Sequence, residues 1–356
     1  MKVLHFAETL MGGPATHLKQ LLPFQVEAYD KVALLCPSSQ KFAAQVAGVE
    51  THTFDGTTRS LGGILRLRNA AKQYASTGEY DIVHLHSSFA GGVGRLINYP
   101  SHTRVVYCAR GWSFAIHKKG LRRYAYETIE RLLSARTDAI INISPDEAEL
   151  ARKAGIPNDR CYTVFNGVAD ANWQYLPDKC TPRKLLFVGR FDRQKGLDIL
   201  LSAMETLRNE GFELTVIGGP VVGKPTMQTL PEYVRNLGWQ SPEVISREMT
   251  ESHAIIMPSR WEGFGFVAAE AMRAARPVVA SKVGGLKDVV IEGETGFFAS
   301  PNSPTSLVEA IRKLKTCNIA EVGRAGRRRY ETHFTSSRMF KEIDLIYKRL
   351  IGNANA

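Results

Sequence analysis

Short apolar runs alternate with longer segments of helical periodicity through the first half of the chain. The runs rich in Val, Ile and Leu predict strands at Lys2–Phe6, Lys31–Leu35, Asp81–His86, Arg104–Cys108 and Ala139–Ile143. Apolar residues at helical spacing predict helices at Ala15–Glu27, Leu61–Ala75, Leu121–Ala135 and Pro145–Lys153. Alternation of this kind favours parallel strands joined by crossover helices, which is a doubly wound α/β sheet.

The second half of the chain repeats this alternation. Strands are predicted at Lys184–Val188, Glu213–Ile217, Tyr233–Leu237, His253–Met257 and Pro277–Ala280. Helices are predicted at Leu197–Asn209, Glu243–Glu251, Phe266–Ala275, Ser306–Leu314 and Met339–Leu350. The pattern therefore predicts two Rossmann-like domains, each with its own parallel sheet.

Residues 166–182 separate the two halves. This stretch is polar, holds two prolines and shows no clear period, so we place the hinge there. The predicted boundaries are an N-terminal domain at 1–168, a linker at 169–182, a second domain at 183–335 and a C-terminal helix at 336–356. Ligands of open α/β sheets bind outside the carboxyl ends of the strands, so we expect a ligand in a cleft between two such domains.

Length and composition agree with a folded two-domain protein. A chain of 356 residues, 44% apolar and 23% charged, exceeds the roughly 250–300 residues at which a single core stops growing. We find neither an apolar run near the ~18 residues of a membrane helix nor a secretory signal. The five cysteines are scattered without a Cys-x-x-Cys pair, which disfavours a disulfide framework or a zinc site and favours the cytoplasm.

The net charge of +11 predicts an anionic partner. Basic residues concentrate at 104–136 and again at 312–349. Charge alone would also suit a nucleic-acid-binding protein. That alternative further predicts base-stacking motifs, and the sequence contains none that we recognise, so we expect no nucleic-acid partner.

The segment Gly189-Arg190-Phe191-Asp192-Arg193-Gln194-Lys195-Gly196 lies between a predicted strand and a predicted helix. Arg190 and Lys195 would then lie on a loop at the carboxyl end of the second sheet. Two cations there could hold a diphosphate leaving group, with charge-assisted hydrogen bonds of roughly 1.5–3 kcal/mol each. The alternative is a surface loop with two solvated cations.

A second segment, Glu262-Gly263-Phe264-Gly265 followed by a predicted helix from Phe266, carries two glutamates eight residues apart. A helix start flanked by glycines presents N–H groups and partial positive charge to an anion. Glu262 in the loop could accept from sugar hydroxyls, and Glu270 in the helix could bind a ribose diol. Equally open is a structural role, with Glu262 capping the helix and Glu270 solvated.

Together these motifs resemble the retaining glycosyltransferases of the large family four, which have the GT-B fold. The resemblance covers nearly the whole chain. Its motifs are Gly12-Gly13, His84-Leu85-His86-Ser87, Asn166-Gly167-Val168, Gly189-Arg190, Lys195-Gly196, Pro258-Ser259, Glu262-Gly263-Phe264-Gly265, Glu270-Ala271-Met272, Pro277-Val278, Gly284-Gly285 and Thr295-Gly296. The Glu-x7-Glu pattern together with the Arg and Lys pair is specific, whereas any single glycine pair is not.

The resemblance implies a role for each matching position. The first domain would provide the acceptor surface and the second would bind the nucleotide sugar, with the last helix packing back toward the first domain. Arg190 and Lys195 would bind the donor diphosphate, and Glu262 would bind sugar hydroxyls; these three are the expected catalytic residues. The other expected donor contacts are the backbone of Phe264, Gly265 and Phe266, the Glu270 carboxylate at the ribose, Gly13, and Gln240 in a weaker match to the base-binding turn.

One position departs from the family pattern. Many relatives carry a histidine before Gly-Trp, where this chain has Arg110-Gly111-Trp112. An arginine could hold a sugar hydroxyl or an anionic group of donor or acceptor, but it cannot act as a neutral base. Arg110 and His86 are therefore expected contacts of acceptor or sugar. His17 is a further possibility on the acceptor side, although a lone histidine is more often structural.

No metal site is expected. The sequence contains no Asp-x-Asp and no cluster of carboxylates or histidines at ligand spacing. Arg190, Lys195 and the helix start at Phe266 would take the place of a cation. We therefore expect no cofactor beyond the nucleotide-sugar substrate, for which UDP is favoured by its breadth of use.

Residues 112–136 combine aromatic and basic residues with an amphipathic helix, which suits an anionic membrane surface. A helix whose charged face is simply solvated would give the same pattern. The sequence thus predicts a retaining enzyme peripheral to the inner face of the cytoplasmic membrane, acting on a lipid-linked or lipopolysaccharide-type glycan in cell-surface polysaccharide synthesis. A non-transferring GT-B enzyme such as a nucleotide-sugar 2-epimerase is the alternative, and the oligomeric state stays open.

Overall fold

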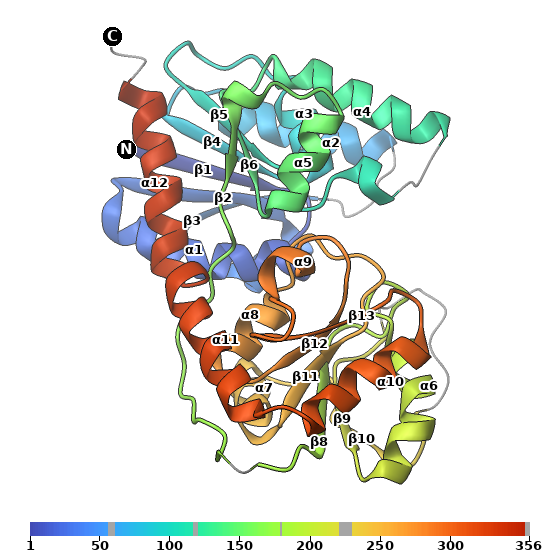
Figure 1. Cartoon of the computed structure of the whole chain (residues 1–356). Helices are drawn as coiled ribbons and strands as arrows, with labels where there is room; N and C mark the ends of the chain where they lie inside the picture. The colour runs from blue at the N-terminus through green and yellow to red at the C-terminus, as the bar shows by residue number, and fades with distance from the viewer. Residues whose placement is uncertain (56–60, 117–119, 179, 221–229, 353–356) are drawn as a thin grey trace. The chain divides into compact units, whose positions relative to one another are not determined.

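The computed structural model describes residues 1–55, 61–116, 120–178, 180–220 and 230–352. The chain divides into two compact units (Figure 1). The first consists of Met1–Gly167 together with Ser336–Ala356, and the second of Val168–Thr335.

The described part of the first unit contains a seven-stranded parallel sheet in the order β3-β2-β1-β4-β5-β6-β7. Its strands are β1 (Lys2–Ala7), β2 (Lys31–Pro37), β3 (Glu50–Phe54), β4 (Ile82–His86), β5 (Arg104–Cys108), β6 (Ala139–Asn142) and β7 (Cys161–Thr163). The two edge strands, β3 and β7, were missing from the sequence prediction. β3 is largely exposed and β7 has only three residues, so neither carries the continuous apolar run of a buried parallel strand.

Helices cover both faces of this sheet. They are α1 (Gly13–Ala28), α2 (Leu61–Ala75), α3 (Ser88–Gly94), α4 (Leu121–Ser134), α5 (Pro145–Lys153) and α12 (Ser336–Gly352), with short 3₁₀ turns at Ser38–Ala44, Ser113–Ile116 and Asn158–Arg160. Leu4 and Phe6 of β1 face a core that includes side chains of α2 and α3, whereas Ala7 packs with Leu18 and Leu22 of α1. The alternation follows from the two-residue period of a strand.

The second unit has a six-stranded parallel sheet in its described part, in the order β10-β9-β8-β11-β12-β13. The strands are β8 (Lys184–Val188), β9 (Glu213–Ile217), β10 (Val234–Asn236), β11 (Ala254–Met257), β12 (Val278–Ser281) and β13 (Gly296–Ala299). In both sheets the strand order changes direction next to the first strand of the unit, because β1 lies between β2 and β4, and β8 lies between β9 and β11. The two parallel α/β sheets agree with the predicted Rossmann-like fold class.

Helices also flank the second sheet. They are α6 (Leu197–Leu207), α7 (Pro242–Glu251), α8 (Phe266–Arg273), α9 (Leu286–Val289), α10 (Pro304–Arg312) and α11 (Ile319–His333), with 3₁₀ turns at Arg208–Glu210 and Lys313–Lys315. The core of this unit is built from apolar side chains of β8, β9, α6 and α10.

Helix α11 was not predicted from the sequence, because two glycines and an arginine run interrupt its apolar pattern. Both glycines approach α8 or the residues just after it: a Cβ on Gly326 would lie 3.3 Å from Met272 of α8, and one on Gly323 would lie 2.3 Å from the carbonyl oxygen of Ala275. Arg327 is buried and pairs with Asp170 at 2.6 Å. The Arg329 guanidinium donates to the carbonyl oxygens of Asp288 and Val289, so these two arginines serve packing within the unit.

The described helices include none of the length and apolar character needed to cross a membrane. All five cysteines are free thiols.

Candidate functional site

The two motifs of the second unit meet at the carboxyl edge of its sheet. The loop 189–196 follows β8 and leads into α6, and the loop 258–265 follows β11 and leads into α8. The Arg260 backbone N–H donates to the carbonyl oxygen of Gln194 at 2.8 Å, and the Gln194 side-chain amide donates to the carbonyl oxygen of Trp261 at 3.2 Å. The structure thus brings together the two segments that the sequence singled out.

Both expected diphosphate-binding cations lie beside carboxylates. Lys195 Nζ lies 2.6 Å from Glu262 Oε2, and Ser259 Oγ donates to the same oxygen at 3.4 Å. The Arg190 guanidinium contacts Asp192 at 3.1 Å and donates to Gln194 Oε1 at 2.8 Å. These contacts fix the positions of the two cationic groups relative to the Glu262 carboxylate.

The α8 helix start lies on this loop. Gly265 is the N-cap residue, with a left-handed φ of 96°, and Phe264 before it is buried. The first N–H groups of a helix have no intrahelical acceptor and carry partial positive charge. Burial raises the pKa of the Glu270 carboxyl on α8, while Arg273 and Lys195 act in the opposite direction.

Close backbone contacts hold the Glu262 loop in position. A Cβ on Gly284 would lie 1.9 Å from the Glu262 carbonyl oxygen, and one on Gly285 would lie 2.2 Å from that of Gly263. The Gly285 N–H also donates to the Glu262 carbonyl oxygen at 3.0 Å. Such approaches need glycine, so the Gly284-Gly285 pair after β12 supports the acidic loop directly.

The predicted base-binding turn lies after β10. Gln240 Nε2 donates to the Leu237 carbonyl oxygen at 2.5 Å, and the neighbouring Trp239 ring is exposed. The Gly218 N–H donates to the Gly238 carbonyl oxygen at 2.8 Å, which joins this turn to the loop after β9.

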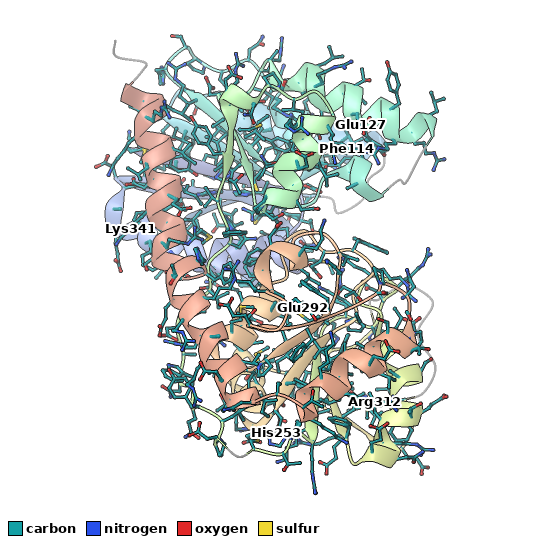
Figure 2. All side chains as sticks on the ribbon, in the orientation of Figure 1. Phe114, Glu127, His253, Glu292, Arg312 and Lys341 are labelled. Carbon is teal, nitrogen blue, oxygen red and sulfur yellow. The ribbon has the colours of Figure 1, made fainter. Side chains whose placement is uncertain are left out.

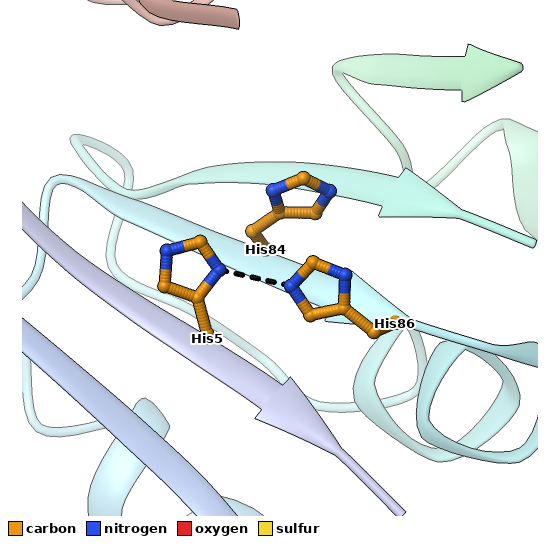
Figure 3. A group of neighbouring side chains, drawn as sticks. All are labelled: His5, His84 and His86. Atoms are coloured by element: carbon orange, nitrogen blue, oxygen red, sulfur yellow. Dashed lines mark hydrogen bonds between the residues drawn. The ribbon is translucent and has the colours of Figure 1, made fainter. Parts of the chain in front are cut away.

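Three buried histidines gather on one face of the first sheet (Figure 3). His5 pairs in register with His84 of β4, and His86 lies two residues further along that strand. Because side chains of a strand alternate between faces, all three point toward the side that α1 and α12 cover. α12 contributes Tyr347, whose hydroxyl lies 2.6 Å from His84 Nδ1.

A directional hydrogen-bond chain runs through this group to Arg110. Arg110 donates to His86 Nδ1 from Nε at 3.2 Å and from NH2 at 2.8 Å, so that nitrogen carries no proton. His86 Nε2 therefore donates to His5 Nδ1 at 2.9 Å, the dashed line in Figure 3. His5 Nε2 in turn donates to Gln25 Oε1 on α1 at 2.6 Å.

A fourth buried histidine, His17 of α1, lies beside this chain. Its Nδ1 donates to Asn166 Oδ1 at 2.8 Å, and Arg110 NH1 approaches the same oxygen at 3.5 Å. His17 and Asn166 are both nearly inaccessible to solvent.

All four histidines are neutral near pH 7. Burial is the main cause: it lowers the pKa of His5 to about 4 and holds those of His17, His84 and His86 well below 6.5. The Arg110 charge lowers each pKa further. Neutral rings can accept the Arg110 hydrogen bonds without repelling its charge.

The histidine group has metal-ligand spacing, which the sequence analysis did not detect. Ligand nitrogens of His5, His84 and His86 all lie within 4.8 Å of one another. A metal on His86 Nε2 would require a proton on Nδ1, where Arg110 already directs two donors. The hydrogen bonds at His86 fit a neutral polar network. The alternating His84-Leu85-His86 pattern, with a histidine in the middle of the first strand, was the available signal.

The expected site residues divide between the two units. Arg190, Lys195, Gln240, Glu262, Phe264, Gly265, Phe266 and Glu270 lie in the second unit, and Gly13, His86 and Arg110 lie in the first. Gly13 is the first residue of α1, after Gly12 with a left-handed φ of 66°. Both ring nitrogens of His86 are engaged within the first unit, by His5 and Arg110.

Two family descriptions match consecutive parts of the chain. "Glycosyltransferase Family 4" matches residues 11–172, and "Glycosyl transferases group 1" matches residues 174–330. An uncharacterized 41.2 kDa protein in the cps region of Klebsiella pneumoniae is 30% identical, over 98% of this chain and 99% of its own length. The chain belongs to the group 1, family 4 glycosyltransferases, and it is a glycosyltransferase.

Solved structures share the fold of the whole chain. The Anabaena protein HepE in complex with UDP-glucose superposes with a TM-score of 0.78 at 19% identity, covering 97% of this chain and 98% of its own. Sucrose-phosphate synthase from Thermosynechococcus elongatus gives 0.83 at 20% identity, covering 99% and 100%. The lipopolysaccharide outer core galactosyltransferase WaaB gives 0.69 at 17% identity, covering 99% of each chain. The fold is GT-B, as the resemblance implied.

Proposed function

We propose that this protein is a metal-independent, retaining glycosyltransferase that moves a sugar from a nucleotide diphosphate to a glycan acceptor in cell-surface polysaccharide synthesis. The second unit binds the donor, and the first contributes contacts to the acceptor. The observation that carries the proposal is the joining of the Arg190–Lys195 loop to the Glu262 loop at the start of α8.

The chemistry follows from where charge develops. As the bond between sugar and diphosphate breaks, negative charge grows on the leaving phosphate. Lys195, Arg190 and the first N–H groups of α8 stabilise it, and removing one such stabiliser typically costs on the order of 10²–10³ in rate. These groups supply the positive charge without a divalent ion. Strict dependence of turnover on added Mg²⁺ or Mn²⁺ would contradict this part of the proposal.

Glu262 has a different task. Its carboxylate pairs with Lys195, and as an acceptor it orients sugar hydroxyls beside the reacting carbon. We assign no covalent nucleophile. The acceptor hydroxyl attacks on the face that the diphosphate leaves, with a phosphate oxygen taking its proton. Determining the anomeric configuration of the product by NMR tests retention.

UDP is the favoured nucleotide. The supporting observation is that HepE, with the same fold, was solved with UDP-glucose. Thermal shift of the purified protein with UDP, GDP and ADP tests the choice, because the ligand that binds the folded protein raises its melting temperature.

Separate Arg190→Ala and Glu262→Ala variants test the site. Each should lower transfer by at least about 10² while far-UV circular dichroism stays unchanged. Arg312→Gln is the matched control: Arg312, labelled on α10 in Figure 2, pairs with Glu210 at the surface of the same unit. Full turnover in both test variants would reject the assignment. Donor consumption that does not depend on acceptor would instead favour an epimerase.

The acceptor is a lipid-linked or lipopolysaccharide-type glycan, and the protein works at the inner face of the cytoplasmic membrane. Two similarities support this acceptor class: the relative from a cps region and the fold shared with a lipopolysaccharide galactosyltransferase.

Helix α4 offers a surface for this membrane. Its exposed face is apolar, with Leu121 83%, Tyr124 63% and Leu132 68% exposed, while its buried face carries Glu130. Arginines at 122, 123 and 131 lie on the same helix. Exposed aliphatic and aromatic side chains beside cations suit the boundary of an anionic bilayer.

Vesicle sedimentation tests the surface. The protein should bind vesicles that contain phosphatidylglycerol more strongly than phosphatidylcholine vesicles, and added salt should weaken binding. A Leu121→Ser/Leu132→Ser variant should lose most of this binding. Leu345→Ser on α12, where the native side chain is 66% exposed, is the control and should bind normally. Equal binding by all three proteins would remove α4 from the proposal.

A further inference from the structure

Arg110 is a cation without a carboxylate partner among the described residues. Among the residues that the structure describes, its guanidinium donates to two neutral groups, His86 Nδ1 and Asn166 Oδ1. Glu147 is close enough to influence its charge electrostatically, yet the Glu147 carboxylate accepts a hydrogen bond from the Ile143 N–H instead of pairing with Arg110. Burial raises the Glu147 pKa to about 7, so that carboxyl compensates the arginine only in part. A half-buried guanidinium in such surroundings favours an anion from outside the chain.

The fold holds Arg110 at a ligand-binding edge. It lies two residues after β5 with a left-handed φ of 54°, at the carboxyl ends of β4 and β5. The strand order reverses between β1 and β4, and open α/β sheets bind ligands at such a point. The hydrogen bonds that link Gln25, His5 and His86 place the ring proton of His86 on Nε2. Nδ1 of His86 therefore keeps a lone pair, which accepts from the Arg110 guanidinium and orients it. His5 and His86 therefore act as positioning residues.

Two buried polar atoms beside Arg110 have no protein partner. Asn166 Nδ2 is an N–H donor, bonded to the same carbon as the Oδ1 that Arg110 and His17 contact. His17 Nε2 is an acceptor, because its Nδ1 carries the ring proton. A buried polar group without a partner is costly, so each is suited to a ligand. The Arg110 and Asn166 donors match an oxyanion, and the His17 acceptor matches a hydroxyl.

We propose that Arg110 and Asn166 bind the oxyanion of an acidic sugar while His17 Nε2 accepts from one of its hydroxyls, so that the protein selects a charged sugar over its neutral counterpart. This inference rests on the proposed glycosyltransferase function and names its substrate class. The acidic sugar is carried either by the donor or by the acceptor, and the two arms of the experiment distinguish these sources.

The donor arm compares UDP-glucuronic acid with UDP-glucose by calorimetry on the full chain. The acceptor arm compares methyl β-D-glucuronide with methyl β-D-glucoside in the presence of UDP. We expect the wild type to prefer the acidic member in one arm by at least about tenfold. Arg110→Gln should lower that preference by roughly 10- to 100-fold, the range of one charge-assisted hydrogen bond, and Arg110→Lys should keep part of it.

Asn166→Asp is a second test, because a carboxylate there would neutralise Arg110 and should abolish the preference without removing the cation. Arg152→Gln, which breaks a surface pair with Glu149, is the control and should leave the preference unchanged. Circular dichroism confirms folding of every variant.

Binding of UDP without a sugar distinguishes a failure of this inference from a failure of the proposed glycosyltransferase function. Wild type and all variants should bind UDP equally. If Arg110→Gln weakens UDP itself as much as the acidic ligand, Arg110 contacts the diphosphate and the acidic-sugar proposal fails. Absence of any acidic preference in both arms also overturns it, while the glycosyltransferase function stands. If the wild type binds no nucleotide sugar, the proposed donor is wrong instead.

Discussion

At the scale of single residues, the glycines of the second unit decide how closely the site loops approach one another. A Cβ on Gly196 would lie 2.1 Å from the carbonyl oxygen of Pro258, and the residue has a left-handed φ of 69°. Gly196 therefore serves both the turn into α6 and the contact that joins the loop 189–196 to the loop 258–265. In the sequence, Gly196 stands only as part of the Lys195-Gly196 motif, and its contact with Pro258 could be found only from the fold.

Gly196→Ala should destabilise the protein and lower transfer, because the new methyl group displaces one loop from the other. Gly211→Ala is the matched control: its φ is 85°, with no atom within 4 Å of the added Cβ. The control should show only the backbone cost, about 1–2 kcal/mol, with normal turnover. Urea unfolding and initial rates measure the two effects. If Gly196→Ala and Gly211→Ala lose the same stability and the same transfer rate, the close approach of Gly196 to Pro258 contributes nothing.

The site residues were predictable to different degrees. Arg190, Lys195 and Glu262 lie in local motifs, and the structure places them together because both loops follow adjacent strands, β8 and β11. The histidine network was missed because its members come from β1, β4 and α1, far apart in the chain. Only the parallel register that pairs His5 with His84 makes them neighbours.

At the scale of elements, most strands with continuous apolar runs were predicted, because a buried parallel strand presents apolar side chains on both faces. The short strand β13 was missed although it is apolar and largely buried. Helix α11 shows where this reasoning fails. Its arginines suggested a basic surface, yet Arg327 and Arg329 are bound inside the second unit, and its glycines exist for close packing on α8. Close packing of this kind depends on the neighbouring helix, so it leaves no apolar periodicity in the sequence of α11 itself.

A buried hydroxyl on helix α12 contacts the first sheet: Tyr347 reaches His84 of β4. Tyr347→Phe should remove the partner of His84 Nδ1 and cost about 1–3 kcal/mol, the range for an unsatisfied buried polar group. Hydrogen–deuterium exchange should then rise in peptides of α12 and β4. Tyr29→Phe loses a half-buried hydrogen bond to Asp344 of α12. This variant should lose less free energy of unfolding than Tyr347→Phe. Unchanged protection in Tyr347→Phe would show that the Tyr347 hydroxyl does not hold α12 in place.

At the scale of the whole molecule, the buried titratable groups set the response to acid. His5 has a folded pKa of about 4 against 6.5 unfolded, so its contribution is complete above pH 6.5 and decreases as pH falls. At pH 5 the loss is about 2 kcal/mol. The lowered pKa values of His17, His84 and His86 act with the same sign.

Buried carboxyls oppose this trend. The Glu147 pKa is about 7 in the folded protein against 4.5 unfolded, so acidification from pH 7 to pH 5 favours the folded state by about 2 kcal/mol. The pKa of the Glu270 carboxyl is also raised and acts in the same direction as that of Glu147. Four buried histidines oppose these two carboxyls, so we expect the urea midpoint to fall from pH 7 to pH 5. His84→Gln should shrink the fall, whereas His102→Gln at the surface should not. A midpoint that rises on acidification would contradict this prediction and would mean that the raised pKa values of the carboxyls outweigh the lowered pKa values of the histidines.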